Sequence, residues 1–64
     1  MTFNIPDMTC GHCVSTITKA IKALDAGAGV TADLATGTLR VETSIPAAAV
    51  SRALDEAGYP NTQA

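Results

Sequence analysis

The spacing of apolar residues switches between two periods along this 64-residue chain, and the order of the switches limits the fold more than any other feature. Three short segments alternate apolar and polar residues, as half-buried strands do, namely 2–5, 30–34 and 39–43. Two longer segments, about 11–25 and 46–57, repeat apolar residues at helical spacing. The chain therefore predicts strand, helix, strand, strand and helix, in this order.

The first predicted strand directs Phe3 and Ile5 toward the core, and Pro6 ends it because proline lacks a backbone donor. The apolar stripe of the first helix consists of Val14, Ile17, Ile21 and Leu24. We expect this helix to close near Asp25, with Gly27 in the left-handed conformation that commonly follows a helix. A short loop joins this strand and this helix.

The two middle strands predict a β-hairpin, because Gly37 in the turn between them can adopt a positive φ. Its inward-facing side chains are Val30, Ala32, Leu34, Leu39 and Val41. For the second helix, Ser44 is the candidate N-cap, Pro46 lies in the first turn and Gly58 follows the end. The apolar side of that helix is expected to carry Ala47, Val50, Ala53 or Leu54, and Ala57. Residues 59–64 have no alternating pattern, so a last strand is expected to be short and at an edge.

This order of elements predicts the fold class α+β, because helices and strands that are each apolar on one side bury those sides in two layers. The expected architecture is a ferredoxin-like βαββαβ sandwich, with an antiparallel sheet and both helices on one of its faces. We expect residues 1–64 to form a single domain, since neither a linker nor a low-complexity segment interrupts them.

Composition excludes several classes of function. The net charge is −2 and only four residues are Lys or Arg, which argues against nucleic-acid binding. The chain has neither an apolar run long enough to span a membrane nor the features of a signal peptide. Its 64 residues leave no room for a deep substrate cavity, so an enzyme is not expected. We expect a cytoplasmic protein that is not inserted into a membrane.

One stretch, from Met8 to Cys13, contains both cysteines and the only histidine. The spacing of Cys10 and Cys13 across a junction from loop to helix can bring the two thiols together. The unpaired N–H groups at the start of a helix favour thiolate over thiol. Two thiolates prefer a soft ion, such as Cu(I) among the physiological ones, and they leave the ion open to a third ligand.

The tetrapeptide from Cys10 to Cys13 also fits a dithiol-disulfide oxidoreductase, so this alternative is kept. Redox versions of the motif usually carry an aromatic residue before the first cysteine, where this chain has Thr9. Haem attachment would need a histidine where Val14 stands, and closed structural zinc sites need four ligands. The surroundings of the motif therefore favour a site for a soft metal, either Cu(I) or another ion such as Hg(II).

The stretch from Met8 to Cys13 after a first strand, the helix that follows, the glycines of the hairpin, and the closing Ala57-Gly58-Tyr59 resemble the heavy-metal-associated domain family. The resemblance covers roughly residues 2–60 and is greatest to free-standing bacterial copper chaperones. It implies a ferredoxin-like fold, Cu(I) held by Cys10 and Cys13, and transfer of copper to a copper-transporting P-type ATPase or its metal-binding domain. A homodimer bridged by copper is a further expectation.

The remaining residues of the site have supporting roles in this interpretation. Met8 packs beneath the metal loop, Gly11 lets the loop turn tightly, and Thr9 caps the helix. His12 faces solvent. The resemblance implies that Tyr59 lies near the metal loop.

Two further features concern the surroundings of the site. Asp7 stands where many family members have glycine, which places a carboxylate at the rim. Lys19 and Lys22 of the first helix form a solvated face that is also a candidate docking surface for an acidic partner.

Overall fold

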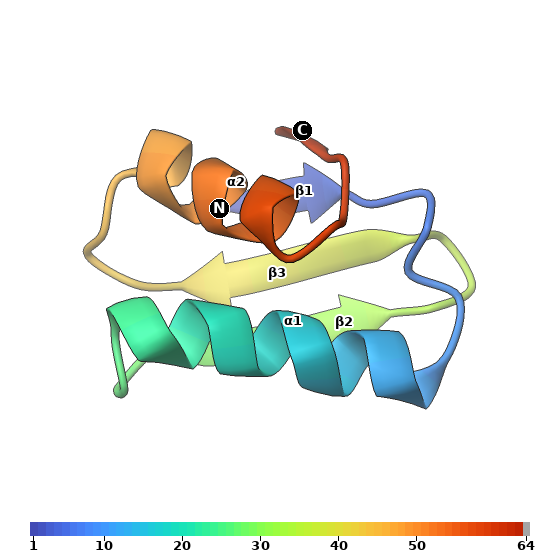
Figure 1. Ribbon diagram of the computed structural model, residues 1–64, viewed down its shortest axis with the longest axis horizontal. Helices are drawn as coiled ribbons and strands as arrows, with labels where there is room; N and C mark the ends of the chain where they lie inside the picture. The colour runs from blue at the N-terminus through green and yellow to red at the C-terminus, as the bar shows by residue number, and fades with distance from the viewer. Residues whose placement is uncertain (64) are drawn as a thin grey trace.

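A computed structural model describes residues 1–63 and contains a mixed sequence of strands and helices (Figure 1). The elements are β1 (Thr2–Asn4), α1 (Gly11–Leu24), β2 (Gly29–Asp33), β3 (Thr38–Glu42), α2 (Ala47–Glu56) and β4 (Thr62–Gln63). Their order is the predicted one, and β4 is the short edge strand expected near the C-terminus. Within the described part of the chain, neither helix has the length and apolarity needed to cross a membrane.

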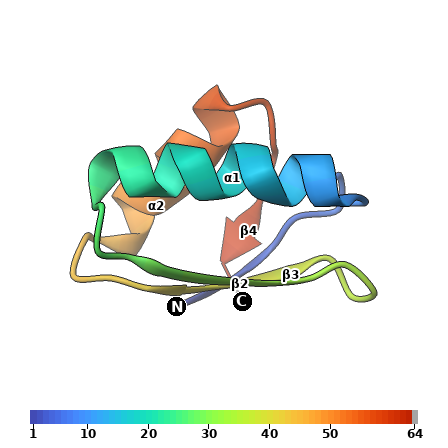
Figure 2. The ribbon, with the colours of Figure 1, turned by 90° about the horizontal axis from the view of Figure 1, so that it is seen from below.

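The four strands form an antiparallel sheet in the order β2-β3-β1-β4. The hairpin pairs Val30 with Val41 and Ala32 with Leu39, while β1 lies between β3 and β4 and pairs Phe3 with Leu39. Both helices cover the same face of this sheet and leave the other face open (Figure 2). The two-layer ferredoxin-like prediction is therefore confirmed.

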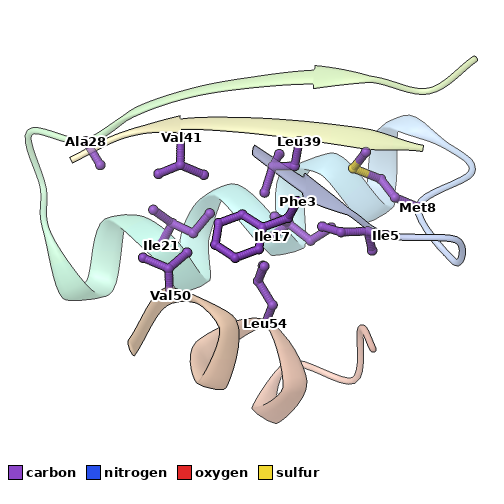
Figure 3. Close-up of a cluster of buried hydrophobic side chains, with 10 residues drawn as sticks. All are labelled: Phe3, Ile5, Met8, Ile17, Ile21, Ala28, Leu39, Val41, Val50 and Leu54. Carbon is purple, nitrogen blue, oxygen red and sulfur yellow. The ribbon is translucent and has the colours of Figure 1, made fainter. Parts of the chain in front are cut away.

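The core lies between the sheet and the two helices (Figure 3). Its fully buried members from the predicted strands and helices are Phe3, Ile5, Ile17, Ile21, Leu39, Val41, Val50 and Leu54. These residues occupy the inward positions of the strand alternation and of the helical spacing, so the apolar pattern located most of the core correctly. Met8 and Ala28, which lie outside the helices and strands, complete the cluster.

Two leucines assigned to the core are exposed. Leu24 is 46% exposed because it is the last residue of α1, at the end of the helix. Leu34 is 42% exposed because it follows β2 and belongs to the turn before β3. The apolar pattern continues in the sequence past the end of the helix or strand, but the residues there no longer have a neighbouring layer to pack against.

Helix ends follow the expectations only in part. α1 ends where predicted, but Gly27 does not take a positive φ, since Asp25 ends the helix in an extended conformation and its carboxylate accepts a hydrogen bond from the Gly27 N–H at 3.0 Å. The N-cap of α2 is Pro46 rather than Ser44, and its carbonyl accepts bonds from the first turn. Gly58 does end α2, with a φ of 92°.

Candidate metal centre

The loop between β1 and α1 is held by a hydrogen bond to the hairpin turn and by the buried side chain of Met8. The Ile5 N–H donates to the carbonyl of Gly37 at 2.7 Å, and the Met8 N–H donates to the carbonyl of Ile5 at 3.0 Å. Gly37 has a φ of 67°, and a Cβ there would lie 3.2 Å from the Ile5 oxygen, so both the backbone conformation and the close approach favour glycine. Met8 is only 1% exposed and packs at the end of the core beside Ile5 (Figure 3).

The two cysteines meet where this loop becomes α1. Cys10 is the N-cap residue of the helix, with φ of −152° and ψ of 168°, and Cys13 lies in the first turn. Their Sγ atoms are 3.4 Å apart, and neither cysteine is in a disulfide. Cys10 is exposed and Cys13 is half-buried, so the pair is open to solvent. The Sγ atom of Cys13 also donates to the carbonyl of Asp7, at 3.7 Å.

The environment of Cys13 favours the thiolate. Its pKa is lowered from 9.0 to about 7, first by hydrogen bonding from the Tyr59 side chain and then by the backbone of Thr9 and the side chain of Cys10. The first turn of α1 contains no acidic residue that would oppose this effect. The same interaction with Cys13 raises the pKa of the Tyr59 hydroxyl, with desolvation as the second cause. One thiol of the pair is therefore substantially ionised near neutral pH.

Tyr59 reaches this position through the turn that ends α2. The Gly58 N–H donates to the carbonyl of Asp55 and the Tyr59 N–H donates to that of Leu54, at 3.0 and 2.9 Å. These bonds, with Gly58 at positive φ, form a Schellman motif, which directs the chain back along the helix. The Tyr59 side chain packs against the core, half-buried. Its hydrogen bond with Cys13 joins the turn after α2 to the start of α1.

Three other residues of the loop have more modest surroundings. Thr9 is exposed and does not cap α1, whose N-cap is Cys10 without a side-chain hydrogen bond. Gly11 is the first helical residue, and a Cβ there would meet nothing within 4 Å, so the tight turn expected at this glycine is wrong. His12 is exposed, as expected, and its carbonyl accepts a bond from the Thr16 hydroxyl at 3.1 Å.

Sequence reasoning missed Asn61, whose side chain holds the turn after α2. It bonds to Ser51, Asp55 and the carbonyl of Tyr59. The available signal was its position after Pro60 in a turn, because an asparagine amide often bonds to nearby backbone.

The donor set limits the chemistry of this site. No group of three or more His, Cys, Asp or Glu side chains able to hold a metal occurs among residues 1–63. The site thus offers two sulfur atoms, one of them readily deprotonated, with solvent on the outer side. Such a pair suits a soft ion and leaves space for an incoming ligand.

A ferredoxin-like sandwich with an exposed dithiol at the start of its first helix defines a class of small α+β proteins. The chain belongs to the heavy-metal-associated domain family, whose sequence profile matches residues 2–60. The resemblance noted from the sequence is therefore confirmed.

Individual relatives show the same relationship. A structure described as a gold binding protein is 48% identical, covers 100% of this chain and 98% of its own, and superposes with a TM-score of 0.96. The copper chaperone Atx1 from Synechocystis PCC6803 is 26% identical over 97% of this chain and 98% of its own, with a TM-score of 0.94. The copper-transporting ATPase 1 of Rhizobium meliloti (strain 1021) is 39% identical over 59 residues, which are 89% of this chain and 7% of that protein.

Proposed function

We propose that this protein is a Cu(I) chaperone that binds the ion through Cys10 and Cys13 and passes it on by ligand exchange. The observation that carries the proposal is the pair of Sγ atoms 3.4 Å apart at an exposed helix start. The lowered pKa of Cys13, about 7, supports it, because the thiolate is the form that binds metal.

Transfer follows from the low coordination number of the site. Two thiolates leave the other directions around Cu(I) open, and the sulfurs lie at the surface. A thiolate of the partner can therefore add to form a three-coordinate bridge before Cys10 and Cys13 leave in turn. Copper passes between proteins without being released as a free ion, which keeps the barrier low.

The proposed recipient is a copper-transporting P-type ATPase. The support is the 39% identity to 59 residues of the Rhizobium meliloti copper-transporting ATPase. Donor and recipient sites of the same fold would hold copper with similar affinity, so the ion could move in either direction with supply. Lys19 and Lys22 are both exposed on α1 and are the proposed docking charges for an acidic partner surface.

In this proposal, residues 1–64 act as one carrier domain in the cytoplasm and catalyse no reaction. A copper-bridged homodimer is included, because two exposed dithiol sites can share an ion. Sedimentation with and without Cu(I) tests it. A species that remains monomeric at high protein concentration in both conditions would contradict copper sharing.

The central test is the copper stoichiometry of the isolated protein. We expect the wild-type protein to bind about one Cu(I) per chain under anaerobic conditions and the Cys10→Ser, Cys13→Ser variant to bind none in competition with a chelator. The matched control is His12→Ala, which alters the exposed residue between the cysteines and should retain the ion. Full copper retention by the double variant would refute the proposal.

A second candidate cargo is a gold ion, favoured by the 48% identity to a gold binding protein. Monovalent gold is soft, like Cu(I), and uses the same thiolate chemistry. Competition between the two ions at the wild-type site, followed by mass spectrometry, separates these cargoes.

Insulin reduction at catalytic protein concentrations would instead support the oxidoreductase alternative.

A further inference from the structure

The side chain of Asn61 hydrogen-bonds both to the turn in which it lies and to α2. Its Oδ1 atom accepts from the Ser51 hydroxyl at 2.7 Å. Its Nδ2 group donates to the Ser51 carbonyl at 3.2 Å, to the Asp55 carboxylate at 3.1 Å and to the Tyr59 carbonyl at 3.0 Å. Both ends of one amide are thus used, and they join the turn to the second half of α2.

These bonds fix the backbone of Tyr59 from both sides. Its N–H donates to the Leu54 carbonyl within the Schellman motif, at 2.9 Å. Its carbonyl accepts from Asn61, at 3.0 Å. With both peptide groups held, the Cα atom has little freedom. The Tyr59 side chain, which packs against the same core as Cys13 and hydrogen-bonds to that residue, therefore starts from a defined point.

Packing by the metal loop does not replace this restraint. A surface hollow of about 250 Å³ is lined by residues of both segments, namely Pro6, Asp7, Pro60, Asn61 and Thr62. The turn after α2 therefore has solvent, rather than the metal loop, on that side. The turn is held on one side by the bonds that Asn61 makes to α2, and beyond Asn61 by the pairing of Thr62 with Asn4.

We propose that Asn61 is a positioning residue of the metal centre, which holds the turn after α2 so that the Tyr59 side chain stays beside Cys13 and slows exchange of the bound ion. This inference rests on the proposed function, since its effect is exerted on a metal carried by the cysteines. Tyr59 acts because a side chain next to the sulfur removes one direction from which an incoming ligand can approach.

The position of Tyr59 can be measured without metal. The chain has one tyrosine and no tryptophan, so its intrinsic fluorescence comes from Tyr59 apart from the weak phenylalanine signal. We expect Asn61→Ala to increase acrylamide quenching of this fluorescence in the metal-free protein. Asn4→Ala is the matched control, because Asn4 is the other asparagine, is exposed and lies on β1.

A double-mutant cycle then links this position to the metal. We expect Asn61→Ala to speed Cu(I) transfer to bicinchoninate about threefold, a size typical of coupled neighbours. Tyr59→Ala should give a similar rate, and adding Asn61→Ala to it should change the rate no further. A purely structural role would lower the melting temperature in both backgrounds without this dependence on Tyr59.

Two results would overturn the inference: unchanged quenching in Asn61→Ala, or an equal effect of that change on transfer in both backgrounds. Asn61→Asp serves where the alanine variant fails to fold, because it keeps the acceptor for Ser51 and loses the donor to Tyr59. It is made together with Asp55→Asn, which removes the carboxylate that would otherwise face the new one. If the wild-type protein bound no Cu(I), the proposed function would fall. The quenching result would still decide whether Asn61 positions Tyr59.

Discussion

The Cys13 thiol is the residue whose ionisation connects the fold to the chemistry of the site. Its pKa is lowered from 9.0 to about 7, with the Tyr59 side chain as the largest cause. We predict that the first step of thiolate absorbance at 240 nm in the metal-free protein, which belongs to Cys13, has its midpoint near pH 7. In Tyr59→Phe the midpoint should move toward 9.0, because the hydroxyl donor is lost. Identical titrations in the two proteins would contradict this assignment.

The direction of the pH effects follows from the same shift. Since the pKa of Cys13 is lower in the folded chain, its thiolate contributes to stability fully above about pH 9, and this contribution is lost as pH falls through about 7. Protons also compete with Cu(I) for the sulfur, so apparent affinity should weaken below about pH 7. Cys13→Ser, which removes the group, is the control for the stability profile.

At the scale of elements, Gly58 after α2 and Gly11 at the start of α1 differ in whether the backbone conformation there needs a glycine. Gly58 follows α2 with a φ of 92°, which is strained for any residue with a Cβ, although the space around it is open. We predict that Gly58→Ala lowers the free energy of unfolding by about 1–2 kcal/mol, through backbone strain alone. Urea denaturation measures this loss.

The matched control for that prediction is Gly11→Ala. Gly11 is the first residue of α1, its φ is not positive and an added Cβ would meet nothing within 4 Å. Alanine is the better helix former, so this variant should be neutral or slightly more stable. A large loss of stability in Gly11→Ala would show that the loop depends on glycine after all.

For the whole molecule, folding should not depend on the metal. Among residues 1–63, ten buried apolar residues form a continuous core, while the sulfur pair lies at the surface. We predict that the Cys10→Ser, Cys13→Ser variant has the far-UV circular dichroism of the metal-free wild-type protein. Added Cu(I) should stabilise the wild-type protein alone, by about 2.7 kcal/mol at a free concentration of 100 Kd. An unfolded metal-free protein would contradict this view.

The sequence was sufficient to predict most of the architecture, because the apolar periods are strong and local. Alternation located the inward residues Phe3, Leu39 and Val41, and helical spacing located Ile17 and Ile21. It failed where an element ended, as at Leu24 and Leu34. A local pattern shows which side of a segment is apolar. Whether another segment covers that side at the end of the helix or strand is set by the rest of the fold.

The sequence by itself also determined the candidate ligands, since Cys10 and Cys13 are the only cysteines and lie one helical turn apart. What only the tertiary structure decided is their environment. Tyr59 lowers the pKa of Cys13 from the far end of the chain, and Asn61 fixes Tyr59 through bonds to α2. Interactions between segments so distant in sequence depend on the packing of both helices against one sheet, which no local pattern encodes.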